Sequence, residues 1–117
     1  MTKELFNAVS RAFKTDCPPI HAVAIDDNER VYVLADMFEG YSPTMPEGQR
    51  NYGFWGSGIF ELRDTGKGYC DMPKIKFFRH FVRAEIAFWD FSKGMKIAKT
   101  ERELQALLQN VTVNEAA

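Results

Sequence analysis

The chain has 117 residues and a formal net charge of −1, which suits a single domain without a global field that would attract nucleic acid or a membrane. Hydrophobic residues make up 45% and charged residues 26%, as in ordinary globular domains. No stretch approaches the roughly 20 apolar residues of a membrane span, and no apolar signal segment opens the chain. We therefore expect a cytoplasmic protein that does not enter a membrane.

An N-terminal helix is predicted over residues 3–14. Thr2 stands where a helix N-cap is needed, and Glu4 in the first turn favours the positive end of the helix dipole. The proline pair at 18–19 cannot continue the helix. The apolar face of this helix comprises Leu5, Val9, Ala12 and Phe13.

Two strands are predicted next, over residues 20–26 and 30–38. Both segments are mostly apolar and contain β-branched residues, and the polar pair Asp27-Asn28 between them suits a tight hairpin turn. Because both faces of the first strand are apolar, we expect that strand to lie inside the sheet.

Residues 39–58 form a long segment rich in glycine, proline and aromatic residues, which predicts an irregular loop. Loops of this length usually carry function or are disordered, and the aromatic residues argue against disorder. Alternatively, Phe54 and Trp55 plug one end of the sheet. The tentative ligand-binding residues are Tyr41, Arg50, Tyr52 and Trp55, with Asp36 from the preceding strand.

A third strand is predicted over residues 59–63, followed by a glycine-containing turn over 64–68 and the start of a fourth strand at 69–70. Asp71 then stands where it can cap a long helix over residues 73–91. A helical wheel groups the apolar residues of that segment into two stripes. The first stripe comprises Ile75, Phe78, Val82, Ile86 and Trp89, and the second comprises Phe77, Phe81, Ala84, Phe88 and Phe91.

A small domain needs only one apolar stripe on a surface helix, so the second stripe requires another cover. We expect the first stripe, with Trp89, to lie in the core. We expect Phe77, Phe81 and Phe88 to form the interface of a homodimer. Residues 82–88 also alternate as a strand would, with 95–98 as the hairpin partner, but the clustering of polar residues on the wheel favours the helix.

The C-terminal part predicts one more helix, from about Thr100 to Gln109, because Thr100 and Glu103 form a capping box. Residues 111–117 are expected to fray. The sequence thus predicts a single α+β domain over residues 1–110. In this domain an antiparallel sheet of four or five strands packs against an N-terminal helix, one long apolar helix and a C-terminal helix.

Motifs for known chemistry are missing from the sequence. The two cysteines and two histidines do not have the spacing of a zinc site, and a Cys17–His21 pair lacks the context of a nucleophilic enzyme. We therefore expect no metal and no cofactor, and we lean against an enzyme. The glycines near Trp55 do not form a phosphate loop.

Three functional hypotheses remain. The first is a non-catalytic binding or protein-interaction module that acts as a homodimer. The second is a small-molecule-binding protein or small enzyme with a pocket under the 39–58 loop. The third is a nucleic-acid-associated regulator that uses the basic residues of 76–96, although the slightly acidic net charge makes nucleic acid the weakest choice of partner.

Overall fold

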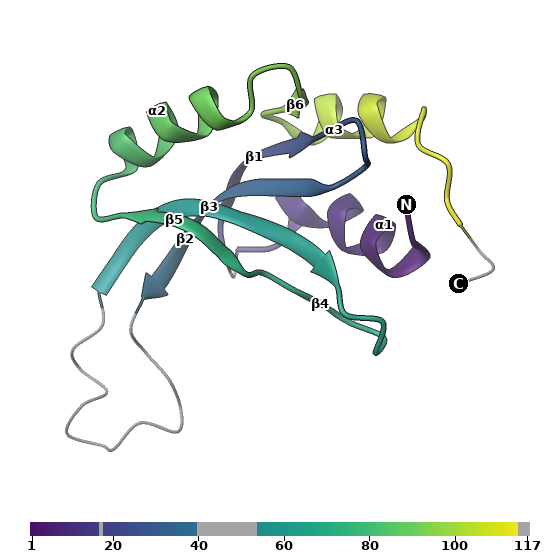
Figure 1. Ribbon diagram of the computed structural model, residues 1–117, viewed down its shortest axis with the longest axis horizontal. Coiled ribbons are helices and arrows are strands. Elements are labelled where there is room, and N and C mark those ends of the chain that lie inside the picture. The colour runs from purple at the N-terminus through teal and green to yellow at the C-terminus, as the bar shows by residue number, and fades with distance from the viewer. Residues whose placement is uncertain (17, 40–53, 115–117) are drawn as a thin grey trace.

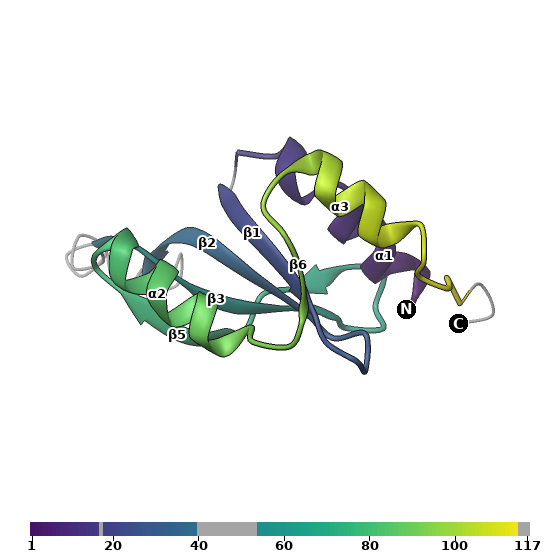
Figure 2. The same cartoon turned by 90° about the horizontal axis from the view of Figure 1, so that it is seen from above.

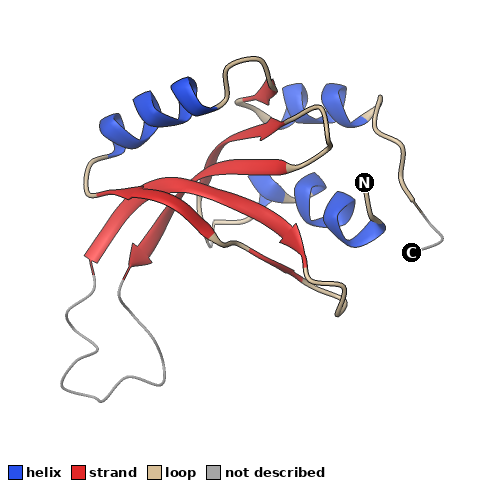
Figure 3. Ribbon diagram, viewed as in Figure 1, coloured by secondary structure: helices blue, strands red, loops and turns tan. Residues whose placement is uncertain are grey.

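The computed structural model describes residues 1–16, 18–39 and 54–114. These residues form an α+β fold in which one six-stranded antiparallel sheet packs against three α-helices (Figures 1 and 3). The predicted fold class is confirmed, with one strand more than the four or five predicted. The elements are α1 (Lys3–Ser10), the short 3-10 helix η1 (Ala12–Lys14), β1 (Ile20–Ile25), β2 (Val31–Glu39), β3 (Phe54–Asp64), β4 (Cys70–Asp71), β5 (Lys74–Phe78), α2 (Phe81–Phe91), β6 (Lys96–Ala98) and α3 (Glu101–Leu108).

The strands lie in the order β4-β3-β2-β1-β6, and β5 pairs with β3 on the edge that β2 leaves open. β1 has a partner on each side, which confirms its predicted position inside the sheet. Its residues from Ala22 to Ile25 are all buried. The apolar character of both faces of this strand therefore follows from burial on both sides.

Helices cover the two faces of the sheet unequally (Figure 2). We call the side that packs against α1 and α3 the α1/α3 face, and the side that packs against α2 the α2 face. The α1/α3 face has the larger apolar cluster, in which Val23, Val33 and Phe60 of the sheet meet Val9 and Leu104 of the helices. On the α2 face the buried cluster consists of Ala22, Ala24, Leu34, Ile59, Ala84 and Phe88.

The segment before α2 is a strand, so the prediction of one helix over 73–91 is wrong in its first part. Residues Lys74–Phe78 form β5 and pair with β3 at Ser57 to Phe60. Without β5, the outer edge of β3 would leave a row of backbone groups unpaired. α2 begins at Phe81, with His80 rather than Asp71 at its N-cap position. The helix assigned to residues 82–91 is confirmed, and β6 pairs with β1 instead of forming a hairpin.

The predicted irregular segment 39–58 is also shorter than expected, because β3 begins at Phe54. Gly56 and Gly58 lie in this strand, and β5 approaches both closely. A Cβ atom on Gly58 would lie 2.3 Å from the carbonyl oxygen of Lys76 and 3.1 Å from the Cα of Phe77. Glycines that resemble loop residues in the sequence therefore permit close packing of two strands.

Neither predicted apolar stripe is buried or exposed as a whole. Ala84 and Phe88 of the second stripe are fully buried, at 0% exposure, whereas Val82 and Ile86 of the first are each 63% exposed. Trp89 is half-buried at the margin of the cluster on the α2 face. The first stripe is continuous only in the predicted long helix, because Ile75 and Phe78 lie in β5 and not in α2.

Local capping signals are confirmed at both ends of the chain. The hydroxyl oxygen of Thr2 accepts a hydrogen bond from the Leu5 amide at 3.2 Å, and that of Thr100 accepts one from the Glu103 amide at 3.2 Å. In the described part of the tail, the Asn114 amide donates a hydrogen bond to the Met1 carbonyl at 2.8 Å.

Candidate functional site

A β-bulge in β1 turns one histidine toward the α2 face. Ile20 pairs with Ala35 and Ala22 pairs with Leu34, so His21 is an extra residue without a partner on β2. Such a bulge interrupts the alternation of side chains along a strand and re-aims the extra one. The His21 ring accordingly contacts Phe81 of α2, with ring centroids 4.7 Å apart.

Asp36 holds this histidine together with a serine from the neighbouring strand. The Nε2 atom of His21 lies 3.0 Å from Asp36 Oδ2. The hydroxyl of Ser57, which pairs with Asp36 across β2 and β3, donates to Asp36 Oδ1 at 2.6 Å. We call His21, Asp36 and Ser57 the polar trio. Its members come from three adjacent strands, and they lie on one face because the bulge brings His21 into line with the other two.

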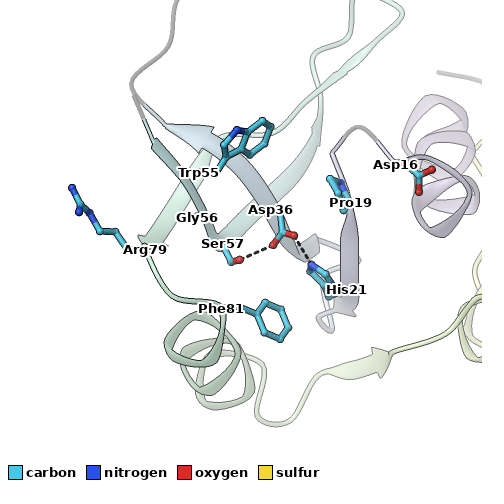
Figure 4. A pocket seen from close by; sticks show the side chains of 9 residues that line it. All are labelled: Asp16, Pro19, His21, Asp36, Trp55, Gly56, Ser57, Arg79 and Phe81. Atoms are coloured by element: carbon cyan, nitrogen blue, oxygen red, sulfur yellow. Dashed lines mark hydrogen bonds and ion pairs between the residues drawn. The ribbon is translucent and has the colours of Figure 1, made fainter. Parts of the chain in front are cut away.

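The polar trio lies in an open pocket of about 520 Å³ (Figure 4). Ser57 is buried at 4% exposure, whereas the side chains of His21 and Asp36 are 37% and 34% exposed and so are within reach of a ligand. Two aromatic residues border the trio, Phe81 at the start of α2 and Trp55, which is 68% exposed. The other residues that line the pocket are Asp16, Pro19, Gly56 and Arg79.

The order of contacts determines what the polar trio can do chemically. In a nucleophilic triad the histidine lies between the serine and the acid and removes the proton of the serine. Here Asp36 lies between the other two residues, so it orients both side chains. This arrangement presents hydrogen-bonding groups at a fixed position, and it leaves Nδ1 of His21 as the imidazole nitrogen not bonded to Asp36.

Two of the five tentative ligand-binding residues, Asp36 and Trp55, line this pocket. The other three, Tyr41, Arg50 and Tyr52, lie outside the described residues. Sequence reasoning missed His21, Ser57 and Phe81 as parts of the site. One signal was available for His21, which is the only polar residue in the otherwise apolar sequence of β1.

The three residues assigned to a dimer interface do not form one surface. Phe77 packs against the cluster on the α1/α3 face, Phe81 borders the pocket, and Phe88 is fully buried beneath α2. Phe77 of β5 packs on the α1/α3 face and Phe88 of α2 packs on the α2 face, so the two residues lie on opposite sides of the sheet. These three residues therefore lie in different surroundings in the described structure.

The basic residues of 76–96 do not share one helix face either. Lys76 is in β5, Arg83 is in α2, and Lys96 is in β6, where it lines a hollow beside Asp26 and Asp27. The continuous basic arc depended on one long helix. Lys76 and Arg83 nevertheless line one hollow, together with Asp90. The nucleic-acid hypothesis stays a prediction.

Among residues 1–16, 18–39 and 54–114, no three His, Cys, Asp or Glu side chains group as metal ligands would. Cys70 is a half-buried free thiol, and Cys17 lies outside the described residues. Burial raises the pKa of the Cys70 thiol, and the carboxylates of Asp64, Glu4 and Asp71 raise it further. A thiol in such surroundings is a poor nucleophile at neutral pH.

Comparisons with known proteins provide no family for this chain. No protein-family model matches it, and neither a curated protein nor a solved structure shows significant similarity. In the part of the chain that the structure describes, no helix is both long and apolar enough to cross a membrane.

Proposed function

We propose that this protein is a small non-catalytic binding module that holds a small organic molecule in the pocket above the polar trio. The observation that carries the proposal is the bulge at His21, which brings a third polar side chain into the open pocket on the α2 face. Bulges are frequent beside binding and active sites, where they re-aim side chains.

The composition of the pocket supports binding rather than a purely structural role. A polar group beside an apolar core stabilises the fold only when its hydrogen bonds are complete, and apolar residues would close the same space at lower cost. Binding pockets combine apolar walls with a few convergent polar groups and commonly have volumes of roughly 300–1,000 Å³. Trp55, Phe81 and the polar trio provide both kinds of group.

The ligand that fits these groups has a flat apolar part and a hydrogen-bonding part. Trp55 and Phe81 provide aromatic surface for the first part. The imidazole of His21 and the partly exposed carboxylate of Asp36 provide hydrogen-bonding positions for the second.

Trp55 also offers a direct test. The chain has two tryptophans, so a Trp89→Phe variant leaves Trp55 as the sole indole reporter at the pocket. We expect members of a fragment library of planar heteroaromatic compounds to change its fluorescence on titration. Hits are then confirmed by amide chemical-shift changes in Ala22, Asp36 and Ser57 of the wild-type protein.

The variant His21→Gln is expected to weaken binding of confirmed hits at least about tenfold, as the loss of one well-placed hydrogen bond would. The matched control is His80→Gln, because His80 is exposed and makes no side-chain cap bond. If no fragment shifts the pocket residues, or if both histidine variants bind equally well, the proposal is wrong.

One observation favours a second candidate, an enzyme that uses His21 for proton transfer. A histidine whose one nitrogen is held by a carboxylate is a common form of general base. Each confirmed hit would be incubated with protein and followed by mass spectrometry. Conversion by the wild type that is lost in His21→Gln and kept in His80→Gln would favour the enzyme. Binding without conversion would favour the non-catalytic module.

A further inference from the structure

The outer side of α2 exposes an apolar stripe that no described element covers. Val82 and Ile86 are one helical turn apart on this side and are each 63% exposed. Phe88, two residues beyond Ile86, is fully buried on the opposite side of the same helix. The stripe is therefore distinct from the core, and water contacts it in the isolated chain.

We propose that a second copy of this chain covers the stripe, with the two α2 helices packed antiparallel about a two-fold axis near Ile86. Val82 and Ile86 of each copy then contact the same pair on the other, which gives the self-complementary surface of a two-fold dimer. This proposal retains the predicted homodimer but assigns it to the opposite side of α2.

Charges beside the stripe match this arrangement. Arg83 and Asp90 are both exposed, and at 100° per residue they lie on the same flank of the stripe, roughly two helical turns apart. A two-fold axis between antiparallel helices places the same flank of each copy side by side. Since the midpoint of 83 and 90 lies beside Ile86, Arg83 of each copy faces Asp90 of the other.

The same pattern argues against a different partner. A surface for an acidic or a basic partner would carry one sign of charge along the helix, whereas α2 itself contributes one charge of each sign to this flank, at positions that exchange under a two-fold rotation. Lys76 of β5 lies in the same hollow as Arg83 and Asp90 and adds one positive charge there. Asp90 already pairs with Lys93 at 3.2 Å, but both side chains are about 80% exposed, and such a pair contributes little. Asp90 can therefore also pair with Arg83 of the second copy.

Sedimentation velocity over a range of protein concentrations tests the oligomeric state. We expect a reversible change from the 13.4 kDa chain to a species of twice that mass. The variants Arg83→Asp and Asp90→Arg each place like charges opposite one another twice in the dimer. Each alone should raise the dissociation constant at least about tenfold, because like charges at an interface suppress association.

An equimolar mixture of the two variants gives the decisive result. In the mixed dimer, positions 83 and 90 are both acidic in the Arg83→Asp copy and both basic in the Asp90→Arg copy. Opposite charges therefore face each other again, and the dissociation constant should return toward the wild-type value. The control is Arg102→Asp, which reverses an exposed charge on α3 and should leave the dimer unchanged. Melting temperatures near that of the wild type show that the variants fold.

Three outcomes would overturn the proposal. The first is a wild-type chain that remains monomeric at all concentrations. The second is a dimer that neither single charge reversal weakens. The third is a mixture that associates no better than the separate variants.

Discussion

The two faces of the sheet differ in how completely helices cover them. On the α1/α3 face the buried cluster is entirely apolar, and two helices that contact one another close it. On the α2 face a single helix covers the apolar cluster, and the polar trio lies beside the start of that helix, against Phe81. The α1/α3 face is thus a closed apolar core, whereas the α2 face combines a smaller core with a pocket at the start of its covering helix.

The largest expected effect tests whether α2 is a true part of the core. Phe88→Ala should destabilise the protein by about 3–5 kcal/mol, because it empties a fully buried site beside Leu34 and Ile59. Urea denaturation measures the loss. Ile86→Ala on the outer side of α2, at a concentration that keeps the chain monomeric, should cost less than about 0.5 kcal/mol. Equal losses would mean that the inner and outer sides were assigned wrongly.

The second prediction concerns the strand that extends the sheet beside the α2 face. Gly58→Ala places a methyl group 2.3 Å from the Lys76 carbonyl oxygen, so β3 and β5 must separate locally. We expect a loss of about 1–3 kcal/mol, as for other overpacked sites. Hydrogen exchange should show faster exchange of β5 amides, while amides of β1 remain protected. Unchanged protection of β5 would contradict the close approach of the two strands.

The third prediction is that the stability of the fold depends on pH through Asp64, at the end of β3 that is far from the pocket. The Thr2 hydroxyl and the Gly66 amide donate to Asp64 and lower the pKa of its carboxyl group below the usual value. A lowered pKa stabilises the folded protein above the unfolded-state pKa of about 4, and the contribution disappears as pH falls through the folded-state pKa.

Asp64→Asn should therefore lower the melting temperature at pH 7, and its difference from the wild type should shrink below about pH 4. Asp27→Asn, which removes a carboxylate from the exposed β1–β2 turn, controls for the change in net charge. A difference between wild type and Asp64→Asn that stays constant from pH 7 to pH 3 would exclude the role of these hydrogen bonds.

The smallest expected effect is at the pocket itself. Trp55→Ala should change the free energy of unfolding by less than about 0.5 kcal/mol, because this side chain is 68% exposed. The same variant should lower the affinity for any ligand that contacts the aromatic residues of the pocket. Urea denaturation and ligand titration measure the two effects separately. A loss of several kcal/mol would make Trp55 a plug of the sheet, and the proposed pocket would lose one wall.

Candidate-site residues were predictable where a single residue carried the signal. An acid close to an aromatic loop predicts Asp36 and Trp55 as site residues, and both line the pocket. The sequence does not predict His21 as a site residue, because strict alternation along β1 does not reveal a bulge. The bulge is a one-residue shift in the pairing of β1 with β2, so it exists only once the two strands pair. This shift brings His21 beside Asp36.

The local elements followed from the sequence because each depends on interactions between near neighbours. Thr2 and Thr100 cap helices with amides three residues away, and the prolines at 18–19 follow the end of the first helical segment. In the β1–β2 turn, Asp26 accepts hydrogen bonds from the Asn28 and Arg30 amides, so the connection stays local although it is longer than the predicted residues 27–29. Such contacts form without any information from distant parts of the chain.

Only the tertiary structure determined that residues 74–78 form a strand and which side of α2 packs against the sheet. The apolar pattern of residues 73–91 fits one helix. However, one edge of β3 has unpaired backbone groups unless another strand binds there, and β5 satisfies their hydrogen bonds. A helix over residues 74–78 would leave those groups of β3 unpaired. Once the helix begins at Phe81, Ala84 and Phe88 point toward the sheet and Val82 and Ile86 point away. Composition could not distinguish two equally apolar stripes, because the choice depends on which side meets Leu34 and Ile59.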